Sequence, residues 1–110
     1  MAYLYIVECE GNTLYTGITT NIENRMKDHK ERRPKCAKYT RSHPVKRLVA
    51  LWKVDTYDHA RKAEYAVKQL DRKKKDRLVA NPEKLKELCP KLSELEFVPI
   101  TDRLDILREI

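Results

Sequence analysis

Two short apolar segments separated by three polar residues limit the folds open to this chain more than any other feature. The segment YLYIVEC, residues 3–9, is rich in aromatic and β-branched residues, and both of its faces are largely apolar. The glycine-containing loop EGN, residues 10–12, follows, and TLYTG, residues 13–17, is typical of a returning strand. The pattern therefore predicts a β-hairpin whose first strand is well buried.

A loop at residues 10–12 also predicts the register of this hairpin. Val7 then lies opposite Tyr15, and Tyr5 lies opposite Gly17. Because side chains alternate along a strand, these four residues share one face, with the two tyrosines as diagonal neighbours about 7–8 Å apart. Gly17 has no side chain to cover the ring of Tyr5, so we expect an open patch with two phenol groups at its edge.

The residues after the hairpin predict an amphipathic helix. TNIE, residues 20–23, fits a capping box with Thr20 as the N-cap, and the helix should end before Pro34. Arg25 and His29 are four residues apart and therefore lie on one side of the helix, at the edge of its apolar stripe. We expect both side chains to point toward the tyrosine face of the hairpin.

The rest of the chain predicts one more strand and several helices. Residues 34–44 are expected to be irregular and basic, and residues 45–54 alternate as a third strand. Asp58 suits the N-cap of a helix that runs to Leu70. Further helical segments are predicted at residues 72–81, 83–89 and 102–110, and an extended stretch at 96–100. The order β-β-α-β-α-α indicates an α+β fold with a small three-stranded antiparallel sheet flanked by helices.

The chain is basic, and its positive charge is concentrated. Its 110 residues carry a formal net charge of +7, with a pI of about 9.4. Residues 1–82 hold a net charge of +9 and residues 83–110 a net charge of −2. An anionic partner is therefore expected, and nucleic acid is the commonest one for a small basic domain, although a solvated charged surface explains the charge equally well.

Several other classes of protein are disfavoured by the sequence. Cys9, Cys36 and Cys89 form no C-x-x-C pair, which indicates reduced thiols rather than a zinc site. No apolar run approaches the length of a membrane span, and no signal-peptide pattern follows Met1. We therefore expect a cytoplasmic protein without a membrane partner, either a monomer or a weak homodimer.

The motifs of the chain resemble those of the GIY-YIG nuclease superfamily. Tyr3-Leu4-Tyr5 matches the first motif and Tyr15-Thr16-Gly17 the second, with an arginine eight residues after that glycine and a histidine four beyond it. The segments LYTGIT, AKYTR and AEYAVKQLDRKKKDRLVA are similar to those of the small stand-alone bacterial proteins of the YhbQ type. The resemblance covers about residues 2–89, so we expect a nuclease domain at 1–89 and a C-terminal extension at 90–110.

The resemblance implies hydrolysis of a nucleic-acid phosphodiester bond with one Mg²⁺ or Mn²⁺ ion. The catalytic residues that it implies are Tyr5, Tyr15, Arg25, His29 and Glu64, with Glu64 as the metal ligand. Three positions depart from the family pattern, and one of them is Thr16 in the middle of the second motif. Tyr3 stands where the first motif has a glycine, and Ile18 stands where some family nucleases carry a lysine, which weakens any transfer of lysine-assisted tyrosine deprotonation.

The residue types suit this chemistry. A hard divalent cation held by a single carboxylate keeps several waters and an open face for phosphate, and arginine offers a planar fork to phosphate oxygens. A phenol near a cation loses its proton more easily and can act as a base. The sequence leaves the base open between Tyr5 and Tyr15, and His29 could orient a tyrosine, contact phosphate or relay a proton.

Residues outside this group are expected to bind the nucleic-acid backbone. They are Lys38, Tyr39, Thr40, Arg41, Lys68, Arg72, Lys73, Lys74 and Lys75. A solvated helical face is the alternative for the run at residues 72–75, and an ion pair with Lys68 is the alternative for Glu64. The expected function is a metal-dependent endonuclease acting on DNA, structure-selective in repair or recombination; the alternative is a nucleic-acid-binding module with weak or no catalysis.

Overall fold

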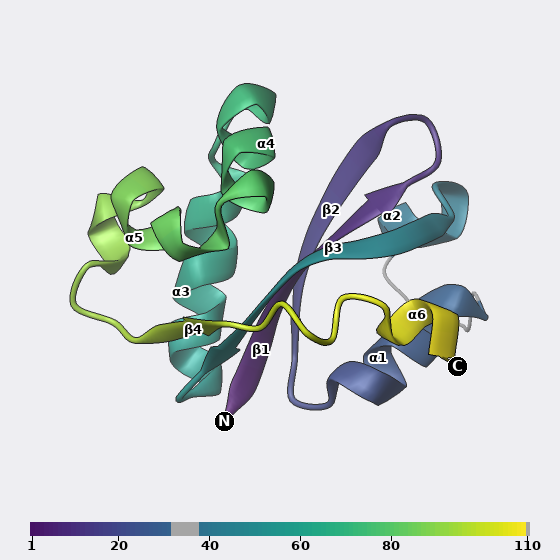
Figure 1. Ribbon diagram of the computed structural model, residues 1–110, viewed down its shortest axis with the longest axis horizontal. Helices are drawn as coiled ribbons and strands as arrows, with labels where there is room; N and C mark the ends of the chain where they lie inside the picture. The colour runs from purple at the N-terminus through teal and green to yellow at the C-terminus, as the bar shows by residue number, and fades with distance from the viewer. Residues whose placement is uncertain (32–37, 110) are drawn as a thin grey trace.

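The computed structural model describes residues 1–31 and 38–109. Its sheet runs between two groups of helices, with α3, α4 and α5 on the left of Figure 1 and α1, α2 and α6 on the right. The strands are β1 (Ala2–Cys9), β2 (Thr13–Thr19), β3 (Val45–Val54) and β4 (Phe97–Pro99). The helices are α1 (Ile22–Lys30), α2 (Lys38–Ser42), α3 (Tyr57–Lys68), α4 (Arg72–Ala80), α5 (Leu85–Leu88) and α6 (Ile106–Glu109), with 3-10 turns at Pro82–Lys84 and Pro90–Leu92.

The hairpin has the predicted register. Val7 pairs with Tyr15 and Tyr5 pairs with Gly17 in the antiparallel ladder of β1 and β2. Gly11 in the loop has a φ of 83°, a conformation that costs glycine little because it has no Cβ. The loop therefore fixes which side chains of the two strands share a face, as the sequence predicted.

The sheet has four strands, so the prediction of a three-stranded sheet is wrong. The strand order is β2-β1-β3-β4, and all three pairings are antiparallel. β4 belongs to the C-terminal extension and pairs Trp52 with Pro99 and Val54 with Phe97. The extended stretch predicted at residues 96–100 contains this strand, but its pairing was not predicted, and it joins the sheet because the outer edge of β3 offers it unpaired backbone groups.

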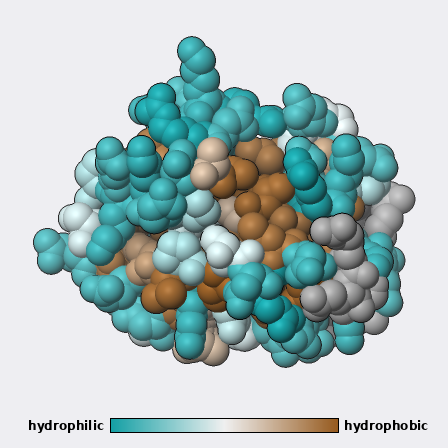
Figure 2. Space-filling view, in the orientation of Figure 1, coloured by the Kyte–Doolittle hydropathy of each residue, from teal (hydrophilic) through white to brown (hydrophobic). Residues whose placement is uncertain are grey.

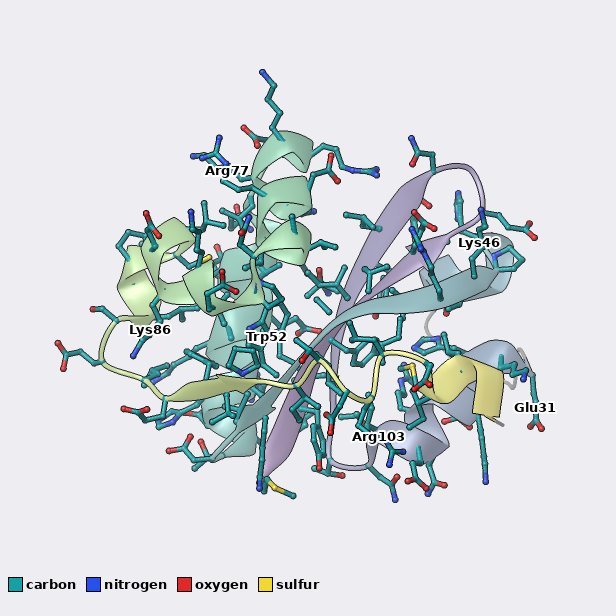
Figure 3. The ribbon with its side chains drawn as sticks, viewed as in Figure 1. Glu31, Lys46, Trp52, Arg77, Lys86 and Arg103 are labelled. Atoms are coloured by element: carbon teal, nitrogen blue, oxygen red, sulfur yellow. The ribbon has the colours of Figure 1, made fainter. Side chains whose placement is uncertain are left out.

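The two faces of the sheet bury separate hydrophobic cores. The core under α3 contains Ala2, Leu4, Ile6, Ala50, Trp52, Val54, Ala60, Ala63, Val67, Leu78, Leu85, Cys89 and Leu92. The core on the other face contains Tyr5, Val7, Cys9, Met26, Leu48, Leu51, Ile106 and Leu107. The indole of Trp52, labelled in Figure 3, donates from Nε1 to the carbonyl oxygen of Pro82 at 2.9 Å. Val49 has no partner in β1, and this bulge lets Leu48 and Leu51 face the same core.

Helix boundaries differ from the prediction by a few residues. α1 begins after Asn21, whose side chain accepts from the N–H of Asn24, so the cap is not Thr20. α3 begins after Thr56 rather than Asp58, and α2 is helical where an irregular stretch was predicted. Neighbouring Thr, Asn and Asp residues all cap well, so the sequence alone does not choose among them. None of the helices in the described part of the chain combines the length and apolar character needed to cross a membrane.

The C-terminal extension packs against α1 as well as against β3. Ile106 and Leu107 are buried in the second core, and Nζ of Lys30 donates to the carbonyl oxygen of Leu107 at 2.9 Å. The guanidinium of Arg103, labelled in Figure 3, lies 3.1 Å from Oε1 of Glu23. The extension thereby joins the helix that carries Arg25 and His29 to the edge of the sheet.

A cleft remains open beside the extension. Figure 2 shows hydrophobic residues gathered in the middle of this face, over β3 between α4 and α6. The cleft has a volume of about 760 Å³ and is lined by apolar residues that include Val49, Val79 and Leu104, together with charged residues such as Lys46 and Asp105. The extension therefore crosses this face of the molecule without covering it completely.

Candidate functional site

The ring of Tyr5 lies directly against Gly17, its partner across the hairpin. A Cβ atom added to Gly17 would clash with the Tyr5 hydroxyl and lie 2.5 Å from Cζ of its ring. Tyr5 is fully buried, so the expected open patch with the Tyr5 phenol at its edge is not there. Gly17 is needed instead because any side chain at this position would occupy the space of the tyrosine ring.

The buried hydroxyl of Tyr5 joins α1 to the hairpin. It lies 2.8 Å from Nε2 of His29 and accepts a hydrogen bond from Nε of Arg25 at 3.3 Å. The Nε–H of Arg25 donates to this hydroxyl, whereas the tautomer of the imidazole sets which of Tyr5 and His29 donates to the other. The other ring nitrogen of His29, Nδ1, lies 3.0 Å from Oγ1 of Thr40. The structure thus brings three of the predicted site residues into one hydrogen-bonded network.

Burial sets the protonation states of this network. Burial, and after it the nearby positive charge of Arg25, lower the pKa of His29 to about 4, so the imidazole is neutral near pH 7. Burial also raises the pKa of the Tyr5 phenol, against the opposing effect of the hydrogen bond from Arg25. Tyr5 is therefore a protonated phenol that is hydrogen-bonded to a neutral imidazole.

Tyr15 is the more accessible of the two tyrosines. It is half-buried, and its ring meets that of His29 edge-on, with 6.1 Å between the centroids. On its other side the ring stacks with Tyr39 at 5.8 Å, and Tyr39 stacks with His43 at 4.3 Å. The aromatic stack attaches α2 to the hairpin and leaves Tyr15 as the phenol that a substrate can reach.

Thr40 and Asp28 have positions in the site that sequence reasoning did not assign to them. Thr40 was expected on a nucleic-acid-binding surface, but it is 1% exposed and its hydroxyl contacts His29. Asp28 lies 3.8 Å from the guanidinium of Arg25 and was not singled out. The i, i+3 spacing of Arg25 and Asp28 on a helix was a signal that could have identified the latter.

Glu64 and Lys68 reach the site from α3. Nζ of Lys68 lies 3.5 Å from Oε2 of Glu64, so the ion pair expected as the alternative for Glu64 is present. The same ammonium group lies 5.5 Å from the centroid of the Tyr15 ring. The pKa of Tyr5 is raised chiefly by burial, and the negative charge of Glu64 adds to that rise. α3 therefore presents a carboxylate and an ammonium group to the tyrosines of the hairpin.

The donor set around Glu64 fits a cation that keeps most of its ligands from water. In the ranges 1–31 and 38–109, no group of three or more His, Cys, Asp or Glu side chains is arranged to hold a metal ion. The carboxylate of Glu64 is 25% exposed, so solvent reaches it. A hard oxygen donor open to water suits Mg²⁺ or Mn²⁺, which dehydrate reluctantly, and does not suit Zn²⁺, which favours several nitrogen or sulfur ligands.

The residues expected to bind the nucleic-acid backbone fall into separate groups. Lys73 and Lys74 are exposed on α4, and Lys75 is half-buried there. Arg72 instead holds α4 to the hairpin loop: it donates to the carbonyl oxygen of Asn12 at 2.6 Å and pairs with Asp76 at 2.9 Å. The side chains of Lys38 and Arg41 lie outside the described residues.

Comparison with known proteins identifies the family of this chain. The family described as the GIY-YIG catalytic domain matches residues 1–77. The UPF0213 protein BH0048 of Halalkalibacterium halodurans is 45% identical over 78 residues, which are 71% of this chain and 81% of that protein. The UPF0213 protein of Syntrophus aciditrophicus is 42% identical over 84 residues, which are 76% of this chain and 95% of that protein.

One solved structure also matches. It is the solution NMR structure of the UPF0213 protein BH0048 from Bacillus halodurans, with 40% sequence identity and a TM-score of 0.47 over 78% of this chain and 94% of that one. The family match covers more than two thirds of the chain and contains both tyrosine motifs, α1 and Glu64. The predicted resemblance is confirmed, and the chain belongs to the GIY-YIG family of nuclease domains.

Proposed function

We propose that this chain is a divalent-metal-dependent endonuclease that hydrolyses phosphodiester bonds of DNA. The observation that carries the proposal is the meeting of two separate elements at the hairpin. α1 contributes Arg25 and His29, which bind the Tyr5 hydroxyl, and α3 contributes Glu64, whose ion-pair partner Lys68 lies over the Tyr15 ring. The carboxylate of Glu64 is partly open to solvent, so a hydrated cation can reach it on the side of the hairpin that carries Tyr15.

Arg25 is assigned to the scissile phosphate. Its guanidinium is half-buried, and the hydrogen bond from Nε to the Tyr5 hydroxyl fixes the plane of the fork. A planar guanidinium matches the oxygens of a phosphate and balances the charge that develops on them during hydrolysis. In this assignment Tyr5 and His29 are positioning residues, since both are buried. The Tyr5 hydroxyl binds Arg25 directly, and His29 acts on Arg25 through its hydrogen bond with Tyr5.

Tyr15 is assigned as the general base: its phenol first loses its proton to solvent, and the resulting phenolate accepts the proton of the attacking water. The buried location of Tyr5 and the bond from its hydroxyl to His29 disfavour it for this role, whereas Tyr15 is half-buried and open to a substrate. The ammonium group of Lys68 and the guanidinium of Arg25 flank the site with positive charge. Geometry thus favours Tyr15 over Tyr5 as the general base, a choice that the sequence left open.

Glu64 is the residue that would hold the metal ion, and a bound Mg²⁺ or Mn²⁺ would polarise the phosphate and a water molecule. The carboxylate must leave its ion pair with Lys68 to act as a ligand. The ammonium group of Lys68 is then available for a phosphate oxygen.

The proposal extends to the substrate and to the setting. The DNA backbone would lie against two helices, at Lys73, Lys74 and Lys75 of α4 and at Lys38, Tyr39 and Arg41 of α2. The nuclease unit would be residues 1–89. The free and buried thiols of Cys9 and Cys89 suit a reducing cytoplasm. We take branched and flapped DNA of the kind met in repair or recombination as the first substrates to test, with the protein acting as a monomer or a weak homodimer.

The second candidate function is a nucleic-acid-binding module with weak or no catalysis. Two observations favour it: Ile18 replaces the lysine found in some family nucleases, and the Tyr5 phenol is buried with a raised pKa. Without that lysine and with Tyr5 buried, Tyr15 is the one residue of the assigned set that is available for proton transfer. The basic surface and the aromatic residues would then serve binding only.

Replacing Glu64 by glutamine separates the two functions. Wild-type protein, Glu64→Gln and the control Glu83→Gln, which changes an exposed carboxylate on the 3-10 turn, are compared on duplex, flapped, branched and single-stranded DNA and on RNA. We expect cleavage with Mg²⁺ or Mn²⁺ by the wild type and the control, and a loss of at least about 100-fold for Glu64→Gln. Binding in chelator should hold, and folding stability should fall by only about 0.2–0.5 kcal/mol. Cleavage by Glu64→Gln at the wild-type rate would mean that Glu64 is not the metal ligand, whereas no cleavage of any substrate by the wild type would leave the binding module as the better description.

A further inference from the structure

Two tyrosines and an arginine form a line on the exposed side of α3. Tyr57, Arg61 and Tyr65 are spaced four residues apart, so they lie above one another on one side of the helix. Tyr57 is 49% exposed and Tyr65 is 68% exposed, and both are among the few large hydrophobic side chains that the described structure leaves at the surface. We call these three residues the α3 stripe.

The α3 stripe runs beside the candidate site. Glu64 directly precedes Tyr65 and lies less than one helical turn beyond Arg61, and its partner Lys68 extends the line toward Tyr15. A molecule whose phosphate lies at Arg25 and Glu64 therefore has the α3 stripe as the next surface along this helix.

No ion pair or ring contact joins the α3 stripe to another side chain in the described part of the chain. Arg61 has no ion pair with any residue in the described part of the chain, whereas Lys62 pairs with Asp58 at 3.7 Å and Lys68 pairs with Glu64. Among the described rings, the contacts involve Tyr5, Tyr15, Tyr39 and two histidines but neither Tyr57 nor Tyr65. A single exposed tyrosine is ordinary, but two that flank an arginine on the helix of the metal-ligand candidate indicate a binding surface.

We propose that the α3 stripe binds an unpaired nucleic-acid strand that leads into the candidate site. Bases of an unpaired strand stack on Tyr57 and Tyr65, and a phosphate between them pairs with Arg61. The inference rests on the proposed function, since it names the substrate class of the same site.

The chemistry of the α3 stripe favours an unpaired strand over a duplex or a protein. Bases in a duplex are covered by their neighbours, so tyrosine rings at the surface gain little from it, whereas every unpaired base offers a face for stacking. The rings of Tyr57 and Tyr65 are separated by eight residues, or about 12 Å along the helix, which is about three or four nucleotides at the duplex rise of about 3.4 Å. The net charge of +9 in residues 1–82 favours a polyanion over most protein partners.

The test measures binding and cleavage separately. The probe is a 12-nucleotide DNA that contains 2-aminopurine, whose fluorescence falls on stacking, and the comparison is its duplex, both in chelator. The variants are Tyr57→Ala/Tyr65→Ala, the ring-preserving Tyr57→Phe/Tyr65→Phe, Arg61→Ala, and the control Val98→Ala, which removes an equally exposed apolar group on β4.

We expect the double alanine variant to bind the single strand at least about 25-fold more weakly, or about fivefold for each ring, and to lose the fluorescence change. The double phenylalanine variant and Val98→Ala should bind as wild type. Arg61→Ala should reduce the slope of log K against log salt by about 0.7. Affinity for the duplex should change less than about twofold in both tyrosine variants.

Three results would overturn the inference. Unchanged single-strand binding by the double alanine variant would exclude nucleic acid from the α3 stripe and leave it open to a protein partner. An equal loss of binding to duplex and single strand would make the stripe a general contact surface. Failure of the double phenylalanine variant would mean that ring stacking is not the cause.

Cleavage distinguishes the inference from the proposed function. If the wild type cuts no substrate but the binding results hold, the proposed endonuclease is wrong and the α3 stripe stands as a single-strand surface. If the wild type cuts and the double alanine variant cuts and binds flapped DNA equally well, the endonuclease stands and the inference is wrong.

Discussion

The hydroxyl of Tyr5 lies 2.8 Å from Nε2 of His29, although the two residues are 24 positions apart and belong to different elements. The contact is fully buried, and Arg25 binds the same hydroxyl. It connects the hairpin to α1 at the point where the arginine enters the site. Changes to either element should therefore be felt at the site as well as in stability, and the following predictions use that link.

Gly17→Ala should destabilise the fold and move Tyr5. The added methyl group would meet the Tyr5 ring and hydroxyl, which have no space to yield because the tyrosine is fully buried. Overpacking of this kind costs about 1–3 kcal/mol. Denaturant unfolding measures the cost, and Thr19→Ala on the same strand serves as a control. Equal stability of the glycine and alanine proteins would contradict the packing described for Gly17.

His29 should make stability depend on pH below neutrality. Its pKa is lowered to about 4 in the folded protein, whereas an unfolded histidine titrates near 6.5, so the unfolded chain binds the extra proton between these values. Stability from this residue is thus present above about pH 6.5 and is lost as the pH falls toward 4. Between pH 7 and 4.5 the loss should be on the order of 1–2 kcal/mol.

Unfolding free energies at several pH values check this dependence. His29→Gln keeps a polar side chain of similar reach but does not titrate, so its stability should vary less over the same window. His59→Gln is a matched control, because His59 lies at the start of α3 and pairs with Asp55 away from the network. A wild type and a His29→Gln variant with parallel pH profiles would show that the imidazole is not held neutral.

Lys68→Met should strengthen metal binding and weaken cleavage. The methionine keeps an apolar stem beside Tyr15 but removes the ammonium group that occupies the Glu64 carboxylate at 3.5 Å. Mn²⁺ titrated into the protein should bind several-fold more tightly, since an ion pair of this kind is worth about 0.2–0.5 kcal/mol and a positive charge near the cation is also lost. Single-turnover cleavage should slow because the phosphate loses a cation. Lys62→Met provides the control, and unchanged Mn²⁺ affinity would argue against Glu64 as the ligand.

Ile106→Ala should lower stability without removing the chemistry. Ile106 is 1% exposed and packs in the core that contains Tyr5 and Met26, so its truncation should cost about 2–5 kcal/mol. The extension contributes no residue to the proposed catalytic set, so the cleavage rate per folded molecule should remain near that of the wild type. Thermal unfolding and single-turnover rates below the transition measure the two effects. A variant that is well folded but inactive would give the extension a direct part in the site.

Local patterns in the sequence determined much of the hairpin and its face. The loop at residues 10–12 fixed the pairing of Tyr5 with Gly17, and the two-residue period then placed Tyr15 on the same side. The i, i+4 spacing placed Arg25 and His29 on one side of α1. These features depend on neighbours a few residues away, so the sequence alone is sufficient to predict them.

Tertiary packing decided the properties that make these residues a site. Only the packing of α1 on the hairpin buries Tyr5 and His29 and shifts the pKa values of both. The contact of His29 with Thr40 and the position of Lys68 over Tyr15 each join elements that are distant in the chain. β4 exists because β3 offers it an edge. Burial, long-range hydrogen bonds and edge pairing depend on which surfaces meet in three dimensions, and no local period in the sequence encodes that meeting.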